Sequence, residues 1–111
     1  MDTKTHNAPS ESDTEQTLRQ WNHERDETYA RMRANGGGPG LASPSMVAGK
    51  TGLETMRRML TGELPYAHIA ETLDCMLVQV GPGRAVFQST PQRKHYNPLG
   101  SVHGGWYATL L

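Results

Sequence analysis

Residues 95–111, HYNPLGSVHGGWYATLL, carry most of the information about the fold of this chain. The stretch is typical of a loop that leads into a helix, with Ser101 as a candidate N-cap. Gly104 and Gly105 at the start of that helix leave the backbone N–H groups of its first turn open to a ligand. The helix dipole favours negative charge at this end, which suits a carbonyl oxygen that becomes an oxyanion.

Each of these residues also has a purely structural interpretation. The Gly104-Gly105 pair suits a close helix–sheet contact that needs small side chains, because a lone glycine pair is weakly specific. Asn97 precedes Pro98, and Asn-Pro often begins a turn. His103, taken alone, is typical of a structural histidine. Both interpretations stay open on these residues alone.

The composition restricts the class of protein. The chain has 111 residues, enough for one small domain. It carries 11 Lys and Arg against 11 Asp and Glu, so it lacks the basic surface of a nucleic-acid-binding protein. No apolar run approaches the roughly 18 residues of a membrane span, and the N-terminus has no apolar signal region. We therefore expect a cytoplasmic protein without nucleic-acid or membrane partners.

Cysteine and the remaining histidines receive no catalytic role. Cys75 is the single cysteine, so neither a disulfide framework nor a cysteine-based zinc site can form within one chain. It has no His or Lys beside it in sequence and is expected to pack in the core. His68 and His95 are given no function, and no metal or cofactor is expected.

The first half of the chain divides into three segments. Residues 1–13 are polar and are expected to form a disordered tail. Residues 14–35 carry a thin apolar stripe at helical spacing and predict a charged surface helix. Residues 36–50 are rich in Gly and Pro, and we expect a linker that decouples this helix from the second half of the chain.

The second half contains one helix and a hairpin before the stretch 95–111. Thr51 and Glu54 have the spacing of a capping box, and Gly62 is a natural C-cap. Residues 72–80 and 85–90 are rich in β-formers, and the intervening GPGR suits a tight reversal. An antiparallel pair of strands is therefore expected.

Residues 96–111, YNPLGSVHGGWYATLL, closely resemble the segment that marks the PaaI-like thioesterases of the hotdog superfamily. Their pattern is an Asn, Pro/Lys-Leu-Gly, a short spacer, His-Gly-Gly and a helix rich in small residues. The resemblance covers residues 51–111 and implies an α+β fold, in which antiparallel strands wrap around a central helix. The chain would then be the first part of a hotdog domain, an N-terminal fragment that ends inside the central helix.

The resemblance also implies an activity, the hydrolysis of acyl-CoA to free acid and CoA. The Gly104 N–H would polarise the thioester carbonyl. Asn97 would help to place the carbonyl or the attacking water, and His103 would lie beside the thioester and hold the loop. The family's catalytic Asp or Glu would lie one position beyond Leu111, so we expect the chain as given to be inactive.

The resemblance further implies a homodimer or tetramer. The family's glycine and carboxylate are eight residues apart on one helix, which is about 12 Å, too far to act on one thioester. Each site therefore takes its carboxylate from the partner subunit. Two other functions stay open: a non-catalytic acyl-CoA-binding hotdog domain or regulator, and, less favoured by the His-Gly-Gly motif, a hotdog dehydratase or hydratase.

Overall fold

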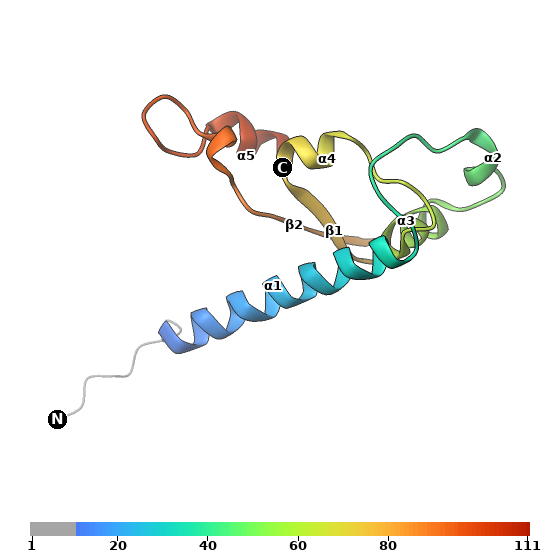
Figure 1. Ribbon diagram of the computed structural model, residues 1–111, viewed down its shortest axis with the longest axis horizontal. Helices are drawn as coiled ribbons and strands as arrows, with labels where there is room; N and C mark the ends of the chain where they lie inside the picture. Colours follow the sequence, from blue (N-terminus) through green and yellow to red (C-terminus); the bar gives the residue numbers. More distant parts are fainter. Residues whose placement is uncertain (1–10) are drawn as a thin grey trace.

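The computed structural model of this protein describes residues 11–111. The described chain is a mixed α+β protein with one two-stranded antiparallel sheet. In Figure 1 the hairpin lies between the long first helix on one side and the two short helices near the C-terminus on the other. The elements are α1 (Glu11–Ala34), α2 (Pro44–Val47), α3 (Gly52–Thr61), α4 (Ile69–Leu73), β1 (Cys75–Gly81), β2 (Arg84–Ser89), the 3-10 turn η1 (Arg93–His95) and α5 (Gly104–Leu110).

Helix α1 begins earlier than its apolar stripe indicates. It starts at Glu11 instead of Thr14, so residues 11–13, which were expected in a disordered tail, are helical. The polar residues of this first turn suit a helix start, because acidic side chains there interact favourably with the positive end of the helix dipole. The rest of the expected tail, residues 1–10, lies outside the described residues.

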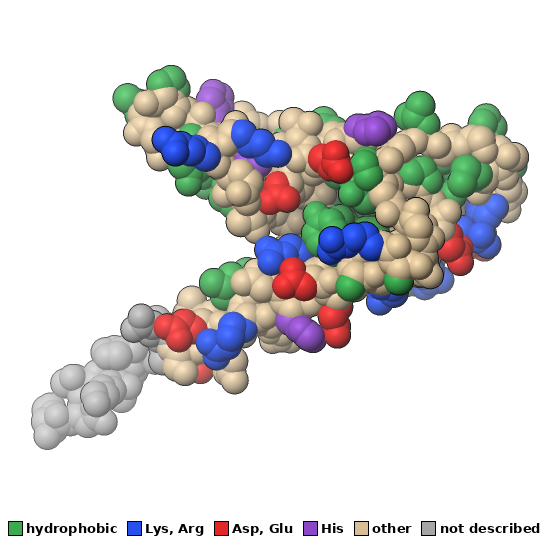
Figure 2. Space-filling view, in the orientation of Figure 1, with side chains coloured by type: hydrophobic (Ala, Val, Ile, Leu, Met, Phe, Trp, Pro, Cys, Tyr) green, Lys and Arg blue, Asp and Glu red, His purple; other side chains and the backbone are tan. Residues whose placement is uncertain are grey.

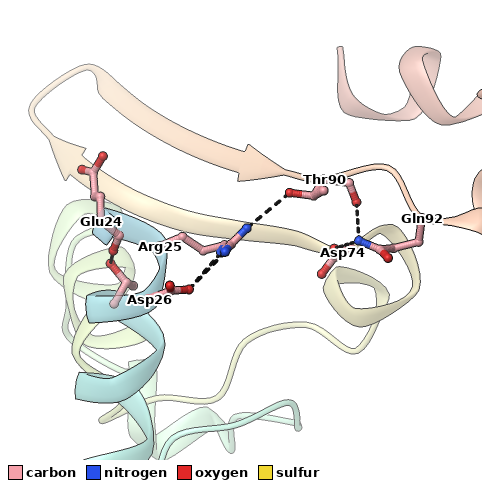
Figure 3. Close-up of polar contacts among 7 residues, drawn as sticks. Glu24, Arg25, Asp26, Asp74, Thr90 and Gln92 are labelled. Carbon is pink, nitrogen blue, oxygen red and sulfur yellow. Dashed lines mark hydrogen bonds and ion pairs between the residues drawn. The ribbon is translucent and has the colours of Figure 1, made fainter. Parts of the chain in front are cut away.

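Only the second half of α1 packs on the rest of the protein. Thr28 and Met32 are buried, whereas Leu18 and Trp21 are 54% and 55% exposed. Arg25 lies at the boundary and donates from Nη1 to the Thr90 hydroxyl at 3.4 Å (Figure 3). The apolar stripe of α1 therefore faces the body of the protein along its C-terminal turns and solvent along its N-terminal turns.

The Gly/Pro-rich segment 36–50 does not decouple α1 from the remainder, contrary to the expectation from its composition. A Cβ atom on Gly37 would lie only 2.6 Å from the Cα atom of Gly62, so the two backbones are in direct contact. The Tyr66 carbonyl accepts a hydrogen bond from the Gly40 N–H at 3.0 Å. The glycines of this segment thus allow a close approach between two parts of the backbone.

Helix α3 confirms the predicted capping box. The Glu54 N–H donates to the Thr51 hydroxyl at 3.1 Å, and the Thr51 N–H donates to the Glu54 carboxylate at 3.2 Å. The helix ends at Thr61, and its C-cap Gly62 has a φ of 90°, in the left-handed region that glycine adopts at low cost.

The predicted hairpin is confirmed, with shifted ends. β1 and β2 are antiparallel, but the first strand begins at Cys75 instead of residue 72, and the second ends at Ser89. The three residues before Cys75 finish α4 and its cap. Asp74 takes a φ of 52°, a left-handed conformation that ends the helix and that Asp tolerates better than most residues.

A β-bulge in the first strand brings consecutive apolar side chains into the core. Leu77 pairs with Phe87 and Gln79 pairs with Val86, which leaves Val78 as the extra residue. The core cluster is small: Met32, Met76 and Val78, with Tyr29, Tyr66 and Val86 packed against it.

An apolar cavity of about 530 Å³ lies beside this core. Its walls come from α3, α4, both strands and the end of α5, and they include Met56, Met59 and Phe87. Figure 2 shows apolar side chains exposed in the middle of the molecule, between α1 and α4. The body of the protein is thus open on one side along apolar walls.

The C-terminal helix begins at Gly104, with His103 as its N-cap, so Ser101 does not cap it as expected. Trp106 is the buried residue of α5, and its Nε1–H donates to the Leu73 carbonyl at 3.1 Å. The expected α+β class is confirmed, while the wrapping of a hotdog sheet around a central helix stays a prediction. Within residues 11–111, no helix combines the length and the apolar character needed to cross a bilayer.

Candidate functional site

The predicted site lies on a small loop and on the helix start that follows it. Tyr96 and Val102 form an isolated antiparallel bridge that closes the loop at its base. Directly after the bridge, the His103 N–H donates to the carbonyl of His95 at 2.8 Å. The loop that carries Asn97 is therefore fixed to the first turn of α5.

The polar groups of Asn97 are all used inside its own loop. Its side-chain oxygen accepts from the N–H of Leu99 at 2.9 Å and from the N–H of Ser101 at 3.2 Å. Its side-chain amide donates to the Ser101 hydroxyl at 2.8 Å, and its N–H donates to the Ser101 carbonyl at 2.8 Å. This geometry fits the turn-forming interpretation of Asn97, and its role toward a substrate stays a prediction.

His103 caps α5 with its side chain. Its Nδ1 atom accepts a hydrogen bond from the Gly105 N–H at 2.8 Å. A Cβ atom on Gly105 would lie 3.0 Å from that Nδ1, so a glycine leaves room for the imidazole above the helix start. One nitrogen of His103 is therefore used by the protein, and the exposed ring keeps Nε2 available to solvent or a ligand.

Gly104 is the position where the backbone is open. The next two N–H groups of α5 are bonded to His103, that of Gly105 to the side chain and that of Trp106 to the carbonyl at 3.0 Å. The Gly104 N–H has no hydrogen-bond partner among the described residues, and a Cβ atom there would meet nothing within 4 Å. Packing therefore does not require glycine at this position.

The three predicted residues do not meet in one cavity. A shallow hollow of about 390 Å³ lies between the end of α4 and the start of α5, and His103 lines it together with Lys94 and Thr72. Asn97 and Gly104 do not line this hollow, and none of the three lines the larger apolar cavity.

His95 is a residue of this region that received no role in the sequence analysis. It is 8% exposed, and both ring nitrogens are hydrogen-bonded, Nδ1 to the Gln92 N–H at 2.8 Å and Nε2 to the Thr72 carbonyl at 2.7 Å. Its ring lies against Trp106, with 5.5 Å between the ring centroids. No local pattern indicates this position, because Thr72 is 23 residues away in sequence.

The loop before the site is tied to the end of α4 by a polar contact. The Gln92 side-chain amide donates to the Asp74 carboxylate at 3.0 Å (Figure 3). Lys94 adds a second contact, because its ammonium donates to the Glu71 carbonyl at 3.0 Å. These contacts anchor η1 and the site loop to α4.

Cys75 is not an activated nucleophile. Burial raises the pKa of its thiol, a hydrogen bond with Ser89 lowers it, and the charge of Asp74 raises it again, with a net upward shift. A raised pKa reduces the thiolate fraction at neutral pH. Within the described part of the chain, no three His, Cys, Asp or Glu side chains group in a way that would hold a metal ion.

Comparison of the chain with family models, curated proteins and solved structures gives no significant match.

Proposed function

We propose that this chain forms the carbonyl-binding part of an acyl-CoA thioesterase of the PaaI-like, hotdog type. One observation supports this proposal most: the unpaired and sterically open N–H of Gly104 at the start of α5, directly after the His103 cap. An exposed N–H at a helix start is a suitable donor for an oxygen that gains negative charge.

In the proposed reaction, the oxygen of a water molecule attacks the thioester carbonyl carbon. The carbonyl oxygen becomes an oxyanion, which the Gly104 N–H stabilises by a hydrogen bond. The C–S bond then breaks, CoA leaves as a thiolate that takes up a proton, and the acyl group is released as the free acid. A general base must remove the proton from the attacking water.

The site segment of this chain supplies no carboxylate for this role. Residues 91–111 contain no Asp or Glu, and the side chain of Asn97 is already bonded within its loop. A second candidate function is a domain that binds acyl-CoA without hydrolysing it, which needs the open Gly104 N–H but no general base. Binding and turnover distinguish the two.

The proposal is tested by binding, with a matched pair of acyl-CoA analogues. One analogue keeps the carbonyl and replaces the thioester sulfur by CH₂, and the other is a thioether without the carbonyl. We expect the carbonyl analogue to bind about tenfold more tightly, the contribution of one hydrogen bond. Equal binding of both, or of neither, would contradict the role of the site in carbonyl recognition.

Turnover is measured separately, by thiol release from a panel of acyl-CoA substrates. The chain as given is expected to show no release above background, because residues 91–111 supply no carboxylate. Release above background would show that another group of the chain acts as the base.

A further inference from the structure

His95 connects three elements around the start of α5. Its ring nitrogens bond the Thr72 carbonyl in α4 and the Gln92 N–H at the start of η1. Its backbone carbonyl accepts from the His103 N–H at 2.8 Å, and its ring lies against Trp106. A buried side chain with this many partners fixes the relative position of the elements that it joins.

These contacts define one tautomer of the imidazole. The Thr72 carbonyl is only an acceptor, so Nε2 must carry the hydrogen. The Gln92 N–H is only a donor, so Nδ1 must present its lone pair. The ring is therefore a neutral imidazole in the Nε2–H form.

The contact between His95 and Thr72 positions η1 relative to α4, because Thr72 lies in the last turn of that helix. The last carbonyls of a helix have no partner within that helix. His95 supplies a donor to the Thr72 carbonyl, and Trp106 supplies one to the Leu73 carbonyl at 3.1 Å. Two side chains whose rings are in contact, one from η1 and one from α5, thus complete the same helix end.

We infer that His95 is a positioning residue for the start of α5, and that protonation of its imidazole releases that start. The positioning acts on Gly104 through the bond to the His103 N–H and through Trp106. The consequence of this positioning for thioester binding rests on the proposed function, whereas the positioning of α5 by His95 does not.

Protonation at Nδ1 removes the acceptor of the Gln92 N–H and places two donors face to face. The charged ring would remain without a counter-ion, since neither Glu71 nor Asp74 forms an ion pair with it and Asp74 accepts from the Gln92 side chain. The positive ammonium of Lys94 already binds the end of α4.

The other groups that face this region are the imidazole of His103 and the phenol of Tyr96. Neither side chain is a carboxylate that could pair with the ring. The C-terminal end of α4 attracts a cation, but α4 has only 5 residues, so its dipole is small.

Nitrogen NMR of the chain labelled at histidine and glycine, followed from pH about 8 to about 5, tests this inference. We expect His95 in the Nε2–H form at the upper end. As His95 takes up its proton, the amide signal of Gly104 should change with the same midpoint. In the Trp21→Phe chain, emission from Trp106 should also show increased solvent exposure at that midpoint.

Matched variants identify the titrating group. His95→Gln keeps a donor for Thr72 and His95→Asn keeps an acceptor for Gln92, but neither side chain takes up a proton, so the transition should disappear in both. His68→Gln, a change at an exposed histidine, and His103→Asn should both retain it.

Three results would overturn the inference: a different tautomer of His95, a protonated ring at the upper pH with Trp106 still buried, or a transition that persists in both His95 variants. The tautomer is read from the unsubstituted chain, so the test does not depend on the variants folding. A chain that shows the transition but binds no carbonyl analogue would refute only the proposed thioesterase function.

Discussion

At the scale of single residues, the start of α5 depends on His103 and Gly105 together. The imidazole caps the helix by accepting from the Gly105 N–H, and it lies where a Cβ atom on Gly105 would be 3.0 Å from Nδ1. The neighbouring Gly104 has no such contact. The two glycines therefore serve different purposes: Gly105 accommodates the cap, and Gly104 leaves an N–H open.

Removal of the cap should destabilise the protein moderately. His103→Ala is expected to lower the free energy of unfolding by about 1 kcal/mol, the usual contribution of an N-cap side chain. His103→Asn offers an oxygen at the capping position and should restore most of the loss. Chemical denaturation of both variants checks this, and equal losses for Ala and Asn would show that the cap contributes nothing.

The open backbone at Gly104 could be predicted from the sequence, but the packing behind it could not. A glycine pair before a helical pattern is a local feature, so it can be read from neighbouring residues. His95 is held by Thr72 and Trp106, which reach it only after the chain has folded back. Contacts of this kind have no local pattern, and so the sequence indicated no role for His95.

At the scale of elements, local hydrogen bonds were more predictable than helix and strand ends. The capping box of Thr51 and Glu54 was predicted because both partners lie within one turn. The start of β1 was placed three residues too early, because Asp74 adopts a left-handed conformation that propensity does not indicate. The residues of the predicted strand that precede Cys75 belong to α4 and its C-cap instead.

The contact between α1 and α3 depends on a glycine with no room for a side chain. Gly62 and Gly100 both have φ of 90°, but a Cβ atom on Gly62 would lie 2.6 Å from the Met32 carbonyl oxygen, while one on Gly100 would meet nothing within 4 Å. Gly100→Ala should therefore cost about 1–2 kcal/mol of stability from strain alone. Gly62→Ala should cost about 2–5 kcal/mol, because α1 must also move.

Denaturation of the two variants under the same conditions measures the difference. Equal losses would mean that the chain relaxes around residue 62 without moving α1, against the close packing described above.

At the scale of the whole molecule, the core is small and open. The cluster of Met32, Met76 and Val78 lies beside a cavity of about 530 Å³ with apolar walls. The core also uses Met32 of α1, and the sequence did not indicate that the linker packs at the end of α3, because Gly37 and Gly62 approach each other only in the folded chain.

Reactivity of Cys75 reports on this core. Burial raises the pKa of the thiol above its ordinary value, so the thiolate fraction at pH about 8 is smaller in the folded chain than in the unfolded one. Labelling by a thiol reagent should therefore be slower without urea than in urea, and should accelerate at the unfolding midpoint. Equal rates would show that the cavity side of β1 is open to solvent.

The most direct test of the proposed carbonyl site is the N–H of Gly104. Gly104→Pro removes this single hydrogen-bond donor, and proline suits the first position of a helix when the preceding residue is extended, as His103 is with φ of −64° and ψ of 135°. Gly104→Ala keeps the N–H and places its Cβ in open space. We predict that Gly104→Pro weakens binding of the carbonyl-containing acyl-CoA analogue about tenfold, with no effect on the thioether, while Gly104→Ala binds both normally. Unchanged binding of the carbonyl analogue to the folded Gly104→Pro chain would contradict the proposal.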